Sequence, residues 1–212
     1  MTSLVHSERP AAGEAEGLLV LHHGRGSDEQ DLLALADMLD PAGRLRVITP
    51  RAPLVLEGSP GYHWYLVPRV GYPDRDTFEA ARAALAELHD GLWEETGIEP
   101  ARTVLGGFSM GTVMSYAMAL SGDRPPVAGI LAFSGFLPTV EDWEPRLDDR
   151  RGTRAFIAHG HRDPIIEVAF AHRARQLLEQ GGLDVDYHES EIGHQIDPAH
   201  LSAASNWLAG SL

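Results

Sequence analysis

A serine lies between two glycines in the stretch GGFSMG, where a short apolar run gives way to a longer one. The run TVLGGF (103–108) has the pattern of a buried strand and residues 110–121 that of a helix, so Ser109 is expected on a tight strand-to-helix turn. Gly107 and Gly111 would allow the close backbone approach that such a turn needs. This geometry presents a hydroxyl above a sheet, as a covalent nucleophile requires. The simpler interpretation is a glycine-rich turn in which Ser109 caps the helix.

A serine hydroxyl needs a base to accept its proton, and two downstream motifs provide an acid and a base in turn. In HGHRDP, Asp163 follows the buried-strand pattern TRAFIAH. In SEIGHQID, His194 lies in a predicted loop before the last helical pattern. The order Ser109, Asp163, His194 predicts a triad in which His194 is the base and Asp163 fixes its tautomer.

Other residues compete for these roles. The rival acids Asp142, Asp148 and Asp149 lie in a polar stretch that does not directly follow a strand. Of the rival bases, His188 falls within a strand pattern and His200 lies on the last helix. The simpler interpretations are that Asp163 only caps a helix before Pro164, and that His194 is a surface histidine.

Two backbone amides are expected to hold the oxyanion that such chemistry produces. The amide of Met110 lies at the positive end of the helix after the nucleophile. The amide of Arg25 lies in LHHGRGSDE, where Gly24 and Gly26 permit a tight loop. The Arg25 side chain is either solvated or meets an acidic substrate. In the long loop at 50–76, Trp64 and Tyr65 are expected either to form a pocket wall or to anchor the loop.

Two hypotheses from other functional classes remain open. HGHRD matches the His-x-His-x-Asp spacing of two-metal hydrolases, with His159, His161 and Asp163 as ligands and His22, His23 or His194 completing a site. Pro164 stands where a further histidine would be expected, and this reading leaves the serine turn unexplained. The second alternative is a non-catalytic binding protein that keeps the same fold.

The elements that must position these residues alternate between strand and helix, which predicts an α/β fold with a mostly parallel sheet covered on both faces. Ligands of such sheets bind beyond the carboxyl ends of the strands, where all the candidate residues fall. A length of 212 residues fits one domain, 1–212, with 1–16 as a flexible or peripheral segment. The patterns are strands at 17–23, 44–50, 103–108, 127–134, 153–159 and 183–189, and helices starting at Ser27 and Asp76 and covering 110–121, 164–180 and 198–209.

Composition narrows the function classes further. A formal charge of -14 repels phosphate backbones and argues against a nucleic-acid partner. The absence of cysteine excludes disulfides, thiolate metal sites and cysteine nucleophiles, and the absence of lysine excludes Schiff-base chemistry. No apolar run approaches the roughly 18 to 20 residues of a membrane span, and no signal-peptide core is seen, so a cytoplasmic protein is expected.

Four stretches, LHHGRGSDEQDLL, GGFSMG, HGHRDPIIE and IGHQID, together resemble the small α/β-hydrolases of the carboxylesterase/phospholipase family, relatives of acyl-protein thioesterases and lysophospholipases. The resemblance implies Ser109, Asp163 and His194 as the triad, the Arg25 and Met110 amides as the oxyanion hole, and no metal or organic cofactor. It implies cleavage of small carboxylic esters, with thioesterase or lysophospholipase activity as the alternative. The resemblance also allows a homodimer. The short segment between LAFSG and TRAFIAH leaves little room for a lid.

Overall fold

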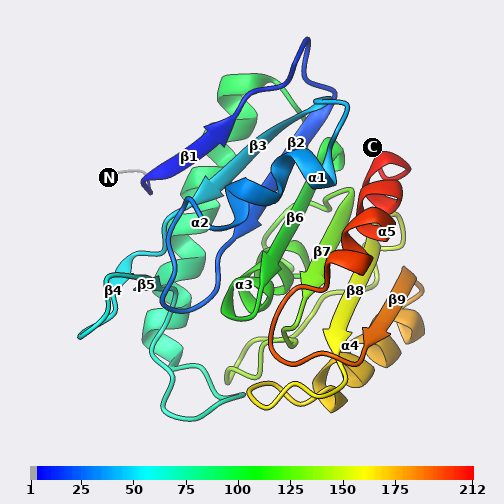
Figure 1. Ribbon diagram of the computed structural model, residues 1–212. Helices are drawn as coiled ribbons and strands as arrows, with labels where there is room; N and C mark the ends of the chain where they lie inside the picture. The colour runs from blue at the N-terminus through cyan, green and yellow to red at the C-terminus, as the bar shows by residue number, and fades with distance from the viewer. Residues whose placement is uncertain (1–3) are drawn as a thin grey trace.

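The computed structural model describes residues 4–212, and its strands and helices alternate along the chain (Figure 1). In chain order the elements are β1 (His6–Arg9), β2 (Gly17–His22), the 3-10 helix η1 (Leu32–Leu35), α1 (Ala36–Leu39), β3 (Leu45–Pro50), β4 (Leu54–Val55), β5 (Tyr62–His63), α2 (Arg75–Thr96), the 3-10 helix η2 (Pro100–Arg102), β6 (Thr103–Phe108), α3 (Met110–Ala119), β7 (Gly129–Phe133), β8 (Arg154–Gly160), α4 (Ala169–Gln180), β9 (Asp184–Ser190) and α5 (Pro198–Ala209).

The main sheet has seven strands in the order β1-β3-β2-β6-β7-β8-β9. All neighbours pair in parallel except β1, which runs antiparallel to β3 with His6 opposite Pro50. The predicted mostly parallel sheet is confirmed. β1 was not predicted, and it makes residues 6–9 an edge strand within the segment expected to be flexible or peripheral. Residues 1–3 of that segment lie outside the described part of the chain.

Successive residues of the central strands point to opposite faces and build two apolar cores. On β2, Leu18 and Val20 belong to the core beneath α2, α3 and α4, whereas Leu19 and Leu21 belong to the core beneath α1 and α5. Figure 1 shows the same division, with α1 and α5 on the near face of the sheet and the other three helices behind it. Because both faces are covered, the strands read as continuous apolar runs rather than alternating ones.

The strand order reverses at the centre of the sheet, and this reversal creates the crevice that the site occupies. From β2 the chain moves outward to β3 through α1, and from β6 it moves the opposite way to β7 through α3. Since α1 and α3 cover opposite faces, the loops after β2 and β6 diverge at the carboxyl ends of two adjacent strands. Open α/β sheets bind ligands at such a switch point.

Three predicted helix starts differ from the structure. No helix begins at Ser27, because its carbonyl accepts a hydrogen bond from the Tyr62 amide at 2.8 Å in an isolated β-bridge. A turn follows, and the first helical residue is Leu32. The helix expected from Asp76 is capped instead by Asp74, whose side chain accepts the Thr77 amide at 3.0 Å. Asp76 lies in the first turn, where its charge still complements the helix dipole.

The third difference concerns α4, which begins at Ala169 rather than at Pro164. The Asp163 carboxylate accepts the amides of Ile165 and Ile166 at 2.8 and 2.9 Å, so it closes a local turn that is not continued as a helix. By contrast, Pro198 is the first residue of α5 and Asp197 caps it, as predicted.

A buried arginine links α3 to the segment between β7 and β8. The Arg150 side chain has no exposed surface and donates hydrogen bonds to the carbonyls of Ala119 at 3.0 Å and of Ser121 and Arg124 at 2.7 Å each. These carbonyls lie at and just beyond the carboxyl end of α3, where a cation also complements the helix dipole. The guanidinium further pairs with Asp149.

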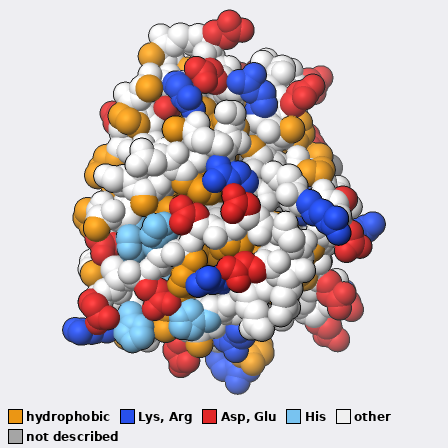
Figure 2. All heavy atoms as spheres, turned by 90° about the vertical axis from the view of Figure 1, so that its right-hand side faces the viewer, with side chains coloured by type: hydrophobic (Ala, Val, Ile, Leu, Met, Phe, Trp, Pro, Cys, Tyr) orange, Lys and Arg blue, Asp and Glu red, His pale blue; other side chains and the backbone are white. Residues whose placement is uncertain are grey.

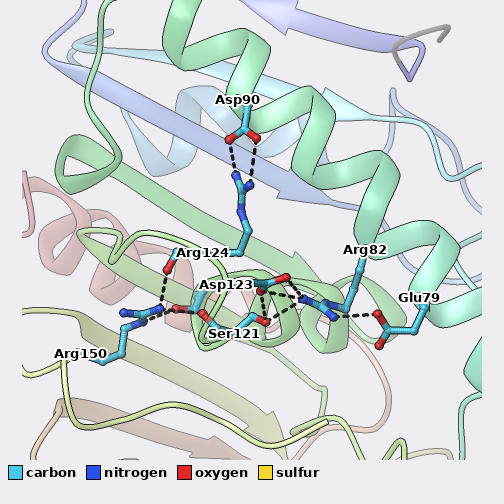
Figure 3. A network of polar contacts seen from close by, with 8 residues as sticks. Glu79, Arg82, Asp90, Ser121, Asp123, Arg124 and Arg150 are labelled. Atoms are coloured by element: carbon cyan, nitrogen blue, oxygen red, sulfur yellow. Dashed lines mark hydrogen bonds and ion pairs between the residues drawn. The ribbon is translucent and has the colours of Figure 1, made fainter. Parts of the chain in front are cut away.

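Ion pairs then extend this network to α2, as Figure 3 shows. Arg82 on α2 contacts Asp123 in the loop after α3 and Glu79 on its own helix. Arg124 reaches back to Asp90 on α2. The network therefore fastens the long helix to the loop that follows α3, at the end of α3 opposite to Ser109.

The outer face around β9, α4 and α5 carries interspersed acidic, basic and histidine side chains (Figure 2). There Glu189 contacts both His161 and His172, and His188 contacts Asp186. Within residues 4–212, no helix is both long enough and apolar enough to cross a bilayer.

We expect Arg150→Leu to lower the free energy of unfolding by about 3 kcal/mol or more, because it removes three hydrogen bonds that a buried side chain donates to backbone carbonyls. Exposed Arg151→Leu is the matched control and should change it by less than about 0.5 kcal/mol. Urea unfolding of both variants measures the difference. Equal stability of the two variants would show that the buried guanidinium does not stabilise the fold.

Candidate active site

The turn after β6 holds Ser109 in a strained conformation. Its φ of 55° and ψ of -117° lie outside the regions that L-residues normally adopt, and its amide donates to the Phe133 carbonyl on β7 at 2.9 Å. The Thr112 hydroxyl lies 2.6 Å from the Gly107 carbonyl and 2.7 Å from that of Phe133, so it closes the turn from below. The Ser109 side chain makes no cap bond to the helix, unlike in the simpler interpretation.

Close backbone contacts explain both flanking glycines. A Cβ on Gly111 would lie 1.9 Å from the carbonyl oxygen of His22 and 2.6 Å from that of His23. A Cβ on Gly107 would lie 2.5 Å from the backbone of Gly111. The first turn of α3 therefore packs directly on the end of β2, and no side chain fits between them.

The structure brings the three predicted triad residues together although they come from three separate loops. The Ser109 Oγ lies 2.9 Å from His194 Nε2, and His194 Nδ1 lies 2.6 Å from Asp163 Oδ2. Because a carboxylate only accepts hydrogen bonds, Nδ1 carries the proton and Nε2 is free to accept the serine proton. The Phe108 ring packs against the imidazole with centroids 4.9 Å apart.

The Asp163 carboxylate is buried and held from several sides. Its Oδ1 accepts the two amides of the turn described above, and its Oδ2 also lies 3.4 Å from His159 Nε2. His159 donates from the same nitrogen to the Ile166 carbonyl at 2.8 Å. Burial lowers the pKa of His159, although the Ile166 carbonyl and Asp163 oppose this, so the ring is a neutral donor at pH 7. Sequence patterns did not predict that His159 would lie beside the Asp163 carboxylate.

Backbone hydrogen bonds fasten the loops of Asp163 and His194 to each other. The His161 amide donates to the Ser190 carbonyl at 2.7 Å, and the Arg162 amide donates to the Ile192 carbonyl at 3.0 Å. These bonds extend the pairing of β8 and β9 beyond the sheet, so Asp163 and His194 lie on one connected pair of loops.

The two residues whose amides are predicted to hold the oxyanion border the same cavity as the serine. Arg25 and Met110 line it together with Ser109 and His194. Within residues 4–212, neither the Arg25 nor the Met110 backbone amide has a hydrogen-bond acceptor. Two unpaired donors beside a nucleophile are what the stabilisation of an oxyanion requires.

The cavity has a volume of about 390 Å³ and a largely apolar lining. Much of its wall comes from the long loop before α2 and from the turns after β7 and β8. Of the two loop aromatics, Tyr65 lines the cavity and Trp64 does not: the indole is fully buried and donates to the His23 carbonyl at 2.9 Å. The wall residues that sequence patterns did not single out include Val67, Val70, Tyr72, Phe136, Ile165 and Ile166.

The rival residues lie elsewhere. Asp142 pairs with Arg75 and Asp149 with Arg150, while His188 pairs with Asp186. None of Asp142, Asp148, Asp149, His188 and His200 lines the cavity.

The possible metal ligands are engaged in other contacts. His159 faces the Ile166 carbonyl, His161 faces Glu189, and Asp163 faces His194. In the described part of the chain, no three or more histidine, cysteine, aspartate or glutamate side chains are grouped so that they suit a metal ion. The His-x-His-x-Asp spacing thus reflects three different local roles.

Comparison with known proteins identifies the family and the fold of this chain. A family model described as Phospholipase/Carboxylesterase matches residues 7–212. The chain belongs to the phospholipase/carboxylesterase family. Its relatives include acyl-protein thioesterase 1 of Emericella nidulans, which is 26% identical over 94% of this chain and 92% of that protein. The fold is therefore the α/β-hydrolase fold, and the family is one of esterases and thioesterases.

Solved structures agree over the full length. The crystal structure of esterase PE8 is 30% identical with a TM-score of 0.84, and the match covers 100% of both chains. The carboxylesterase of Bacillus cereus, 23% identical, has a TM-score of 0.86 over 99% of this chain and 95% of its own, which shows the same fold.

We expect Gly111→Ala to lower the free energy of unfolding by more than about 3 kcal/mol or to prevent folding, because backbone oxygens surround the site of the new methyl group. Gly91→Ala is the control: Gly91 lies on the exposed face of α2 with nothing within 4 Å, and alanine there should stabilise by about 0.5 to 1 kcal/mol. Thermal and urea unfolding measure both. A Gly111→Ala protein of wild-type stability would contradict the contact with β2.

Proposed function

We propose that this protein is a serine hydrolase that cleaves carboxylic esters of short-to-medium acyl chains through an acyl-enzyme. The observation that carries the proposal is the hydrogen-bonded chain Ser109–His194–Asp163, with distances of 2.9 and 2.6 Å, opening onto an apolar cavity. Membership of a family of esterases and thioesterases supports it.

In the first half of the proposed reaction, His194 Nε2 accepts the proton of Ser109 as Oγ attacks the acyl carbon. The carbonyl π electrons move to oxygen, and the amides of Arg25 and Met110 bind the resulting oxyanion. One such donor contributes roughly 3 kcal/mol to the transition state. Asp163 stabilises the imidazolium, which then protonates the leaving alcohol as its bond to the acyl carbon breaks.

In the second half, water takes the place of the alcohol. His194 accepts a proton from the water as its oxygen attacks the acyl-enzyme, and the same two amides hold the second oxyanion. Collapse of this intermediate breaks the bond to Ser109, and the imidazolium returns a proton to Oγ. The carboxylic acid leaves and the free enzyme is restored.

The size of the cavity supports the proposed acyl length. A volume of about 390 Å³ is near the lower end of the roughly 300 to 1,000 Å³ of ligand pockets. Val67, Phe136 and Ile166 offer apolar surface to an acyl chain next to the nucleophile. The segment between β7 and β8 contains no helix or strand, so no helical lid extends the cavity over a long chain.

A thioesterase or lysophospholipase activity is the alternative, since the same nucleophile and amides serve both esters and thioesters. The relatives named acyl-protein thioesterase and lysophospholipase-like protein favour it. The leaving group therefore has to be tested separately from the acyl group.

Replacement of the proposed nucleophile and acid tests the mechanism. We expect Ser109→Ala to abolish hydrolysis of p-nitrophenyl butyrate and covalent labelling by a fluorophosphonate, because no hydroxyl remains to attack. Asp163→Asn should slow kcat by about 10⁴-fold through the wrong histidine tautomer. Both rates are taken on protein shown to be folded by circular dichroism.

Asp148→Asn is the matched control and should keep wild-type activity. Residual hydrolysis above a few per cent in Ser109→Ala, or a large loss in Asp148→Asn instead of Asp163→Asn, would contradict the assigned roles.

A series of p-nitrophenyl esters tests the proposed acyl class. Each methylene buried in the cavity contributes about 0.8 kcal/mol, so kcat/KM should rise by up to about fourfold per added carbon and level off once the cavity is filled. Butyrylcholine and butyrylthiocholine form a matched pair for the leaving atom. The best rate with palmitate, or a strong preference for the thioester, would favour the alternative activity.

A further inference from the structure

The side chain of His23, at the end of β2, is buried and forms a hydrogen bond through each ring nitrogen. Its Nε2 accepts the Ala52 amide at 3.0 Å, and its Nδ1 lies 2.7 Å from the Gly24 carbonyl oxygen. Because the Ala52 amide can only donate, Nε2 is bare and Nδ1 carries the proton. The ring therefore donates to the Gly24 carbonyl in one defined tautomer.

The Gly24 carbonyl and the Arg25 amide belong to one peptide unit. A trans peptide is planar, so its carbonyl and its N–H point in opposite directions, and the orientation of one determines that of the other. Arg25 lines the cavity beside Ser109, and its amide has no acceptor within residues 4–212. We infer that His23 is a positioning residue that aims the Arg25 amide at the oxyanion.

Two further contacts hold the ring and its backbone from behind. The Trp64 indole donates to the His23 carbonyl at 2.9 Å, and the two rings pack with centroids 5.4 Å apart. Ala52 follows β3, so the imidazole joins the loop after β2 to the segment after the neighbouring strand. Without these braces a loop containing Gly24 and Gly26 would have many backbone conformations available to it.

The charge state of the ring fits this role. Burial lowers the pKa of His23, although the Gly24 carbonyl and the nearby Asp31 and Asp28 act in the opposite direction. The ring is thus neutral at pH 7 and keeps the bare nitrogen that Ala52 needs. Its place is distinct from that of His194, which faces the serine from the other side of the sheet centre.

A pair of substitutions separates the two ring nitrogens. In His23→Asn the side-chain amide nitrogen replaces Nδ1 and can still donate to the Gly24 carbonyl. In His23→Gln the longer side chain reaches the position of Nε2 and can still accept from Ala52, but nothing donates to Gly24. We expect His23→Gln to lower kcat by about 10- to 100-fold with KM changed less than about threefold, since the complete loss of an oxyanion donor costs about 10²- to 10³-fold.

His23→Asn should keep kcat within about fivefold of the wild type. The rate of fluorophosphonate labelling should fall in parallel with kcat, because the phosphoryl oxygen uses the same amides. The pH dependence of kcat/KM should stay unchanged in both variants, since His194 and Asp163 are untouched. Rates are referred to the folded fraction measured by urea unfolding.

Equal kcat in the two variants, or a loss that appears only in KM, would overturn the role of His23. If neither variant folds, Trp64→Phe provides the second measurement: it removes the donor to the His23 carbonyl and should lower kcat several-fold at unchanged KM, whereas an unchanged kcat would overturn the inference.

This inference rests on the proposed function, and the two fail differently. A wild-type protein that neither hydrolyses esters nor reacts with the fluorophosphonate refutes the proposed function. A wild-type protein that does both, and loses both in Ser109→Ala, leaves the two His23 variants as a test of positioning alone.

Discussion

The direct contact between the first turn of α3 and the end of β2 is the constraint on which the rest of the site depends. Because Gly111 lies against the His22 and His23 carbonyls, the helix begins immediately after the strand and Ser109 is left in a left-handed conformation at the bend. That conformation is unfavourable in an isolated chain. It persists here because both sides of the turn are held: the Ser109 amide donates a hydrogen bond to the Phe133 carbonyl, and α3 packs on the sheet.

The site also depends on the reversal of strand order at the centre of the sheet. This reversal places the loop after β2 and the loop after β6 side by side, so a residue of each loop with an unpaired amide lines one cavity. The proposed acid and base come from the other half of the sheet, where backbone hydrogen bonds connect the loops of Asp163 and His194. Each functional group is thus held by an element with its own packing.

Two buried histidines carry part of this support, His23 through both ring nitrogens and His159 through Nε2. His159 lies behind the acid and His23 lies behind the oxyanion loop, and burial lowers the pKa of both rings. Neutral rings place hydrogen bonds beneath the site without adding charge beside His194. On the outer face, by contrast, His161 and His172 are exposed to solvent, and both pair with the carboxylate of Glu189.

The sequence alone predicted most of the alternation of strands and helices and the mostly parallel sheet, and it singled out Ser109, Asp163 and His194 as candidates, because apolar periodicity and residues just after strands are local signals. Only the tertiary structure decided that β1 pairs at the edge, that Trp64 points inward to His23, and that Asp163 closes a turn instead of starting α4. Each of these depends on a partner distant in sequence or on competition between two nearby hydrogen bonds, and residue type does not specify which partner wins.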